Sequence, residues 1–178
     1  EDTPVMVCVP ITDTDNSSFT VTSFCAPDGG VVSGLTNPAT TQYCLTYTPN
    51  LNFNGPDTLC ILVCDAAGAC DTSFVFITVT PVNDAPTAPN PMVTTPEDTP
   101  IPICVPITDV DNTTFTVTSF CAPDGGVISG LTNPATTQYC LTYTPNLNYN
   151  GPDTLCILVC DPAGACDTSY VIITVTPV

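Results

Sequence analysis

The chain has 178 residues, of which 17 are acidic and none is Lys, Arg or His, so its formal net charge is −17. This balance excludes nucleic acid as a direct partner, because no side chain can neutralise phosphate, and an anionic membrane surface would also repel the chain. Each carboxylate must therefore face water, accept backbone N–H groups or bind a cation from solution.

The sequence consists of two copies of one block. Residues 1–82 and 97–178 differ at eleven positions, nearly all of them mild changes such as Val5 to Ile101 and Phe53 to Tyr149. The repeat step of 96 residues is the size of a whole small domain, so the pattern indicates an array of domains. We predict one domain over residues 1–82 and a second over residues 83–178, with a linker at 83–86. Both ends lie inside the repeat frame, so we expect an excerpt of a longer secreted polypeptide in which the first domain lacks its first strand.

In chain order, short runs rich in Val, Ile, Thr and aromatic residues alternate with Pro, Gly, Asn and Asp, as in the strands and turns of a β-sandwich. In the first copy we predict strands at residues 5–12, 19–24, 31–35, 43–48, 58–64 and 70–80, with a loop at Asn37-Pro38. The second copy repeats these strands after an additional one at residues 87–95. The predicted fold class is all-β, with two tandem seven-stranded sandwiches.

Four motifs occur in order along the chain: the acidic loop Asp13-x-Asp15, the corner Tyr47-Thr-Pro-Asn…Asn52-Phe53-Asn54-Gly55, the closing Val79-Thr-Pro-Val-Asn-Asp-Ala-Pro86 and the opening Glu97-Asp98-Thr99-Pro100. Together they resemble the Ig-like or cadherin-like tandem repeats of giant bacterial surface adhesins, over both copies. The resemblance implies Ig-like sandwiches in an extracellular protein. Typical members are poor in cysteine, so this chain departs from them in its six cysteines per copy.

The twelve cysteines predict disulfides and an oxidising, extracellular compartment. Zinc is the weaker interpretation, because the chain has no histidine and no Cys-x-x-Cys. Side chains alternate along a strand, and this alternation places most cysteines outside the core, where they can bridge neighbouring strands of one sheet. The predicted pairs are Cys8–Cys44, Cys25–Cys60 and Cys64–Cys70, repeated as Cys104–Cys140, Cys121–Cys156 and Cys160–Cys166. The second of these pairs needs a β-bulge, because simple alternation would turn Cys25 inward.

Acidic and amide side chains cluster in the loops that we expect on both sides of the linker. Six to eight oxygen ligands in loose geometry are what Ca²⁺ requires, and cadherins, which this layout resembles, place calcium at the matching interdomain positions. We therefore predict a Ca²⁺ site among Glu1, Asp2, Asp57, Asn83, Asp84, Asp109, Asp111 and Asp161. The alternative is that these acidic loops only keep an extracellular protein soluble.

The same alternation places large apolar side chains on the outer face of one sheet. These residues are Leu62, Phe74 and Phe76 in the first copy, and Leu158, Tyr170 and Ile172 in the second. A contiguous exposed apolar patch suggests a partner surface, so we expect identical chains to pack side by side in a fibre, with a single-chain stalk as the alternative. Without its first strand, the first copy should expose the strand at residues 5–12 as an open edge.

Catalysis is disfavoured, because the only acid–base groups are carboxylates in solvated loops and no base lies near a cysteine in the sequence. No apolar run approaches the length of a membrane span, so we expect no membrane insertion. The sequence is most consistent with a spacer or filament module of a long secreted or cell-surface adhesin, disulfide-stapled and protease-resistant, whose partners are further copies of the repeat. The alternative is a carbohydrate- or cell-binding adhesion module. Near-identity of the copies favours the spacer.

Overall fold

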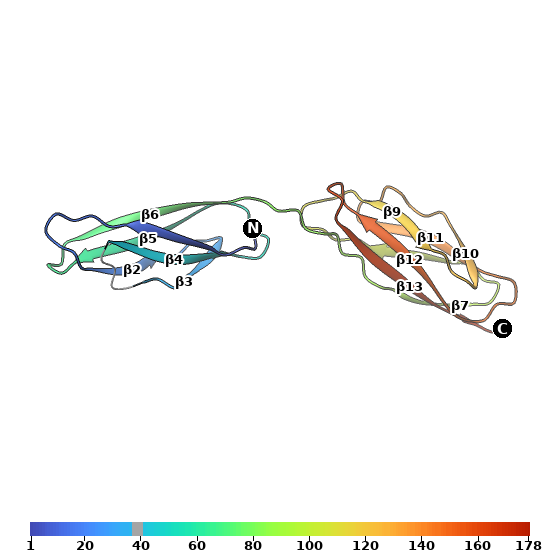
Figure 1. The fold of residues 1–178 in the computed structure, drawn as a ribbon. Helices are drawn as coiled ribbons and strands as arrows, with labels where there is room; N and C mark the ends of the chain where they lie inside the picture. Colours follow the sequence, from blue (N-terminus) through green and yellow to red (C-terminus); the bar gives the residue numbers. More distant parts are fainter. Residues whose placement is uncertain (37–40) are drawn as a thin grey trace. The chain divides into compact units, whose positions relative to one another are not determined.

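The computed structural model describes residues 1–36 and 41–178, so the predicted loop at Asn37-Pro38 lies outside the described residues. The described residues form thirteen strands and divide into two compact units, Glu1–Val82 and Asn83–Val178 (Figure 1). None of these residues belongs to a helix that is long and apolar enough to cross a membrane.

Unit 1 consists of two three-stranded antiparallel sheets. Its strands are β1 (Val5–Pro10), β2 (Phe19–Cys25), β3 (Gly30–Ser33), β4 (Gln42–Pro49), β5 (Gly55–Asp65) and β6 (Cys70–Val79). The strand orders are β1-β4-β3 and β2-β5-β6. Burial alternates along β4, so every second side chain faces the other sheet and the rest face outward.

Unit 2 repeats this arrangement with one additional strand. Its strands are β7 (Met92–Pro96), β8 (Ile101–Pro106), β9 (Thr116–Cys121), β10 (Gly126–Ser129), β11 (Gln138–Pro145), β12 (Gly151–Cys160) and β13 (Cys166–Thr176). The strand orders are β10-β11-β8 and β7-β13-β12-β9. The all-β fold with seven strands in the complete unit is as the sequence predicts.

The position of the additional strand differs from the expectation. β7 pairs in parallel with β13, whereas β8, the counterpart of β1, is an edge strand in unit 2 as β1 is in unit 1. The strand at residues 5–12 is therefore an open edge, as predicted, but the reason differs, because in unit 2 the additional strand pairs with β13 and leaves β8 an edge as well. Prolines at 86, 89 and 91 cannot donate ladder hydrogen bonds, so the upstream part of the segment forms only one bridge, from Thr87 to Thr108.

The core of each unit lies between its sheets and is dominated by aliphatic side chains and two tyrosines. Tyr43 and Tyr47 are the largest fully buried side chains of unit 1, and Tyr139 and Tyr143 are their counterparts in unit 2. A buried tyrosine must place its hydroxyl on a partner or leave it unsatisfied. The hydroxyl groups of Tyr47, Tyr139 and Tyr143 donate hydrogen bonds. The hydroxyl group of Tyr43 has no partner among the described residues.

Candidate functional site

All twelve cysteines form disulfides, in the pairs expected from strand alternation. Each bond joins neighbouring strands within one sheet, and Cys8–Cys44 and Cys64–Cys70 link residues directly opposite one another. The Cys25–Cys60 bond lies where the register between β2 and β5 shifts. This shift is the expected β-bulge, because simple alternation would turn the side chain of Cys25 inward. Unit 2 repeats all three bonds, so each sandwich is stapled twice in one sheet and once in the other.

Two of the cysteines are buried although they lie outside the core clusters. Cys60 is 3% exposed and Cys156 is 9% exposed. In unit 1, the cross-strand neighbours of Cys60 are Cys25 on one side and Phe74 on the other. A disulfide flanked in this way is shielded on the outer face of its sheet, so its reduction requires local opening.

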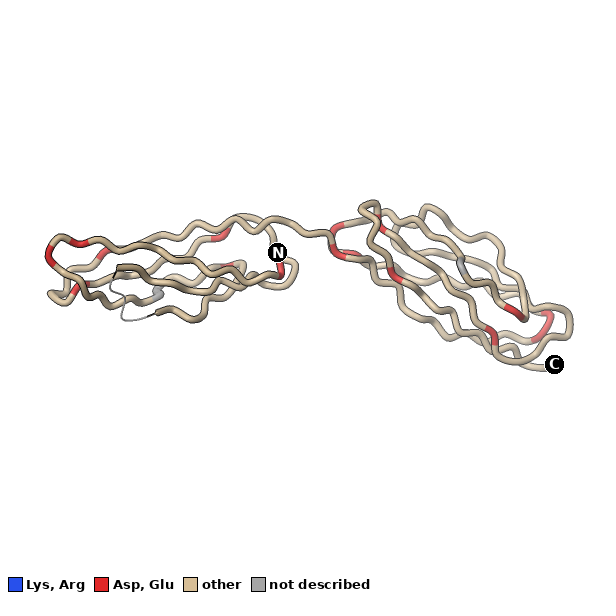
Figure 2. The backbone as a smooth tube through the Cα atoms, in the orientation of Figure 1, with Lys and Arg blue, Asp and Glu red and all other residues tan. Residues whose placement is uncertain are grey.

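An acidic cluster lies at the end of unit 2 where the chain enters. It comprises Asn83 and Asp84, Asp109 and Asp111 from the loop after β8, and Asp161 from the turn between β12 and β13. Most acidic residues of each unit lie in loops near its two ends (Figure 2). Five of the eight predicted calcium ligands thus come together within one unit.

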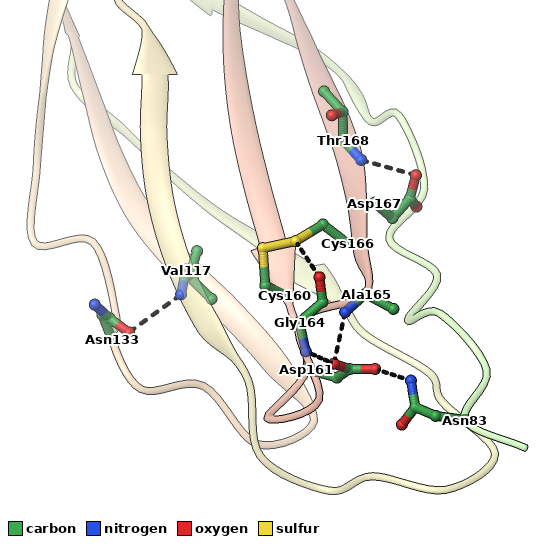
Figure 3. Close-up of a disulfide and its surroundings, with 10 residues drawn as sticks. All are labelled: Asn83, Val117, Asn133, Cys160, Asp161, Gly164, Ala165, Cys166, Asp167 and Thr168. Atoms are coloured by element: carbon green, nitrogen blue, oxygen red, sulfur yellow. Dashed lines mark hydrogen bonds between the residues drawn. A yellow bond between two sulfur atoms is a disulfide. The ribbon is translucent and has the colours of Figure 1, made fainter.

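Hydrogen bonds hold this cluster in place. The amide of Asn83 donates to Asp161 Oδ2 at 2.6 Å (Figure 3). Its own Oδ1 accepts from the amide of Asn112 at 3.0 Å. The backbone N–H of Asp84 donates to Asp111 Oδ2 at 2.8 Å. Polar contacts therefore fix the entering chain to both loops.

The carboxylates of the cluster differ in how their charge is compensated. The amide of Asn83 lowers the pKa of Asp161; burial opposes this effect, and the backbone N–H groups of Ala165 and Gly164 reinforce it. Asp109 Oδ1 accepts two backbone N–H groups at 2.8 Å. Asp109 Oδ2 is buried and has no hydrogen-bond partner among the described residues. A buried carboxylate oxygen without a donor is costly, and a cation would satisfy it.

Unit 1 carries the same loops without the entering segment. There the amide of Asn16 donates directly to Asp65 Oδ2 at 3.0 Å, and Asp13 Oδ1 accepts the N–H groups of Asp15 and Asn16. These backbone bonds, that of Asp15 first, lower the pKa of Asp13. In unit 2, the counterparts of Asn16 and Asp65 are Asn112 and Asp161, and Asn83 forms a hydrogen bond with each of them. In unit 2 the entering segment therefore adds oxygen ligands to these loops.

Glu1 and Asp2, predicted as calcium ligands from the first copy, lie at the corner between β4 and β5 of unit 1. The Glu1 carboxylate accepts the backbone N–H of Val82 at 3.1 Å and the amide of Asn54 at 3.3 Å. Asp2 Oδ1 accepts the N–H of Asn52 at 3.0 Å. Glu97 and Asp98 repeat these contacts in unit 2. In both units these carboxylates pin the corner.

The structure holds Asp57, which was predicted as a calcium ligand, by hydrogen bonds within unit 1. Its side chain is buried and accepts the hydroxyl of Tyr47 at 2.7 Å together with the backbone N–H groups of Asp28, Gly29 and Thr58. Burial alone would raise the pKa of Asp57, but these four bonds lower it below its usual value. The carboxylate is a structural acceptor that ties the corner to the turn before β3.

Sequence reasoning missed Asn112, which supports the acidic cluster, and the link from Tyr47 to Asp57. The signal for Asn112 was its position directly after the Asp-x-Asp pair in both copies. The tyrosine link had a weaker signal, ten residues between a strand residue and a loop carboxylate. The outer-face residues are placed as expected, with Phe74 59% and Phe76 81% exposed. Tyr170 and Ile172 are also exposed, and Leu62 and Leu158 are half-buried.

Two β-sandwich units of this topology define the Ig-like and cadherin-like class of modules. The family model of the bacterial Ig domain matches residues 1–78 and 83–174, once for each unit. The chain therefore belongs to the bacterial Ig domain family. No curated protein matches the sequence. An Ig-like fold with six disulfides fits an extracellular module.

Several solved structures match this chain, and the two cadherin ectodomains among those named here have a similar fold. The human desmocollin-1 ectodomain is 12% identical with a TM-score of 0.54, covering 90% of this chain and 34% of its own. Extracellular cadherin domains 3–6 of protocadherin gamma B2 are 15% identical with a TM-score of 0.54, covering 100% and 44%. An endo-fucoidan hydrolase of glycoside hydrolase family 107 is 17% identical with a TM-score of 0.44, covering 99% and 26%. The chain thus spans less than half the length of each of these structures.

Proposed function

We propose that this chain is a spacer segment of a long secreted or cell-surface adhesin, in which stapled sandwiches follow one another and carry tension. The observation that supports this role most directly is the position of the two chain ends of unit 2. The chain enters beside Asp161, just before β13 begins, and leaves at Val178, whose N–H donates to Glu97 at 3.0 Å beyond the other end of that strand. Tension applied to the ends therefore runs along the strands.

The disulfides suit a module that is stretched and exposed. Cys104–Cys140 and Cys121–Cys156 enclose overlapping segments of unit 2, so a large part of its chain cannot extend even when the hydrogen bonds break. Each bond also contributes about 2–4 kcal/mol by constraining the unfolded chain. The absence of Lys and Arg removes every site for trypsin-like proteases. These properties favour a durable structural module over an enzyme, and we assign no catalytic role.

We further propose that the acidic cluster of unit 2 binds Ca²⁺. Asp84, Asp109 and Asp111 would supply carboxylate oxygens, while Asp161 orients Asn83. The buried, unpaired Oδ2 of Asp109 supports this assignment, and the chain has no basic side chain that could compensate these charges instead. A bound cation would hold the entering segment against the loops after β8 and β12.

Lateral packing of chains into a fibre is part of the same proposal. The exposure of Phe74 and Phe76 supports it, because large aromatic groups side by side on a sheet face are rarely left to water. A carbohydrate- or cell-binding module is the competing class. The near-identity of the two copies argues for the spacer, since a recognition tip is normally a unique domain. Stretching single molecules under oxidising and reducing conditions tests the spacer role, because intact disulfides shorten the length that each unit releases.

A further inference from the structure

The corner that leads into β12 contains an asparagine directly followed by a glycine. This pair is Asn150-Gly151 in unit 2, and its counterpart before β5 of unit 1 is Asn54-Gly55. No other asparagine in the sequence precedes a glycine. Both asparagine side chains are exposed, and each glycine is the first residue of its strand. Each pair therefore lies at the surface, where a strand begins.

The two glycines have open space around them. Apart from its chain neighbours, a Cβ built on Gly55 would meet no heavy atom of the described residues within 4 Å. A Cβ on Gly151 would meet only the hydroxyl end of the Tyr149 ring, from 3.6 Å. The φ angles of the two glycines, 121° and 134°, are ones that other residues rarely adopt. The backbone nitrogen of each glycine is therefore not shielded by a side chain of its own.

Each unit also contains an Asp-Gly pair, and there the surroundings of the glycine are closed. In unit 2 this pair is Asp124-Gly125. The backbone N–H of Gly125 donates to the buried carboxylate of Asp153 at 3.0 Å, and a Cβ on Gly125 would overlap the ring of Tyr149. Unit 1 repeats both contacts at Gly29. The nitrogen of this glycine is engaged in an enclosed site, so the structure disfavours any reaction of that nitrogen with the preceding side chain.

The Asn150 side chain faces a carboxylate that also holds the chain after β13. Glu97 Oε2 accepts the amide of Asn150 at 3.5 Å, and Glu97 Oε1 accepts the backbone N–H of Val178 at 3.0 Å. The backbone N–H of Glu97 donates to the carbonyl of Thr176, the last residue of β13, at 2.8 Å. Unit 1 repeats the two side-chain contacts. One glutamate therefore links the corner of each unit to the end of its last strand.

We propose that Asn54 and Asn150 are sites of spontaneous deamidation, at which the corner of each unit exchanges an amide for a carboxylate as the protein ages. The backbone nitrogen of the following glycine attacks Cγ of the asparagine, which lies close to it in the chain. The new N–Cγ bond forms as the Cγ–Nδ2 bond breaks, and the leaving nitrogen takes up the glycine N–H proton and departs as ammonia. Water then opens the cyclic imide at either carbonyl, which gives aspartate or isoaspartate.

The product carboxylate would face Glu97 in place of the amide that now donates to it. Two carboxylates in this position repel each other, and the chain has no basic side chain that could compensate them. Isoaspartate also lengthens the backbone by one carbon at the residue before β12. Deamidation therefore loosens the link between the corner and the end of β13. Because ammonia is lost, the change is permanent, and the converted fraction records how long the chain has been in water.

Prolonged warm incubation of the full 178-residue chain at mildly alkaline pH tests the reaction. After reduction and digestion with pepsin in acid, which stops the reaction, mass spectrometry should find conversion first at Asn54 and Asn150, with isoaspartate at both. Asn146 and Asn148 are exposed in the same corner but do not precede a glycine, so they should remain amides over the same period. Conversion of all corner asparagines at one rate, no conversion at Asn54 and Asn150, or isoaspartate appearing first at Asp124 would overturn the proposal.

Three substitutions separate the reaction from its consequence. Asn150→Gln keeps an amide but needs a larger ring, so unit 2 should stop reacting while Asn54 still converts. Asn150→Asp supplies the product charge directly and should speed hydrogen exchange severalfold at the start of β12 and the end of β13. Asn90→Asp adds the same charge to the same unit, where Oδ1 can still accept the N–H of Tyr170, and should leave that exchange unchanged. Equal effects of Asn150→Asp and Asn90→Asp, or continued conversion of the residue at 150 in Asn150→Gln, would contradict the proposed site.

Discussion

The buried link between Tyr47 and Asp57 offers a sharp test of how each corner is held. Replacing Tyr47 with Phe keeps the fully buried ring and removes the hydroxyl that donates to Asp57 Oδ2 at 2.7 Å. A hydrogen bond to a charged group contributes about 1.5–3 kcal/mol. We therefore expect Tyr47→Phe to lower the free energy of unfolding of unit 1 by about 2 kcal/mol. Tyr143→Phe should do the same in unit 2, where the hydroxyl donates to Asp153 at 2.7 Å.

The chain supplies its own control for this measurement. Tyr43 is equally buried, but its hydroxyl has no partner among the described residues, so Tyr43→Phe should be neutral or slightly stabilising. Tyr139→Phe should cost about 1 kcal/mol, because that hydroxyl donates to Ser169. Native-state hydrogen exchange of the full chain, followed residue by residue, separates the two units. Equal losses for Tyr47→Phe and Tyr43→Phe would refute the reasoning.

The same link has a signature in the pH dependence of stability. The folded-state pKa of Asp57 is lowered, whereas an aspartate in the unfolded chain titrates near about 3.9. Its contribution to stability is therefore fully present above about pH 4 and is lost as pH falls through the lower, folded-state pKa. Burial together with the bond to Asp57 raises the pKa of Tyr47 to about 12, which keeps the hydroxyl protonated as the donor. Removal of the donor in Tyr47→Phe should make the acid loss smaller.

The remaining predictions concern calcium and lateral association. Ca²⁺ should raise the thermal stability of unit 2, and Asp109→Asn should abolish this effect. Asp13→Asn, the same change in the other unit, should leave the effect intact. Equal effects of the two variants would mean that the acidic loops serve only as a solubilising surface. Replacing both Phe74 and Phe76 with Glu should split fibres of the parent protein into thinner strands without unfolding the domains, and filaments of unchanged width would exclude this face as the lateral contact.

The disulfide pairs could be predicted from the sequence because they depend on local rules. Alternation along a strand has a period of two, and the strand order of a sandwich limits which strands are neighbours. These two constraints fix Cys8 opposite Cys44. They also show that Cys25 needs an irregularity, which the register shift provides.

Other features depend on tertiary contacts that no local pattern contains. Asp57 lies among Asn, Pro and Gly, as solvated loop residues do, and only the folded corner brings four donors to it. The partner of β7 was missed because its sequence predicts a strand without showing which sheet edge that strand joins, and in unit 2 it joins β13. The role of Asn83 became visible only once both acidic loops were placed around it.

The spacer role is tested most directly by the length that one unit releases when it is pulled open. Fully extended, residues 83–178 would span about 330 Å. With the disulfides intact, the shortest covalent path crosses from Cys104 to Cys140 and from Cys160 to Cys166, which leaves about 56 residues and about 190 Å.

Single-molecule force spectroscopy on an array that contains this chain measures that length for each unfolding event. The account predicts that a reductant lengthens each event by about 140 Å, for unit 1 as for unit 2, because Cys8–Cys44 and Cys64–Cys70 enclose equivalent segments. Events of equal length with and without the reductant would contradict the claim that the disulfides limit the extension of the chain under tension.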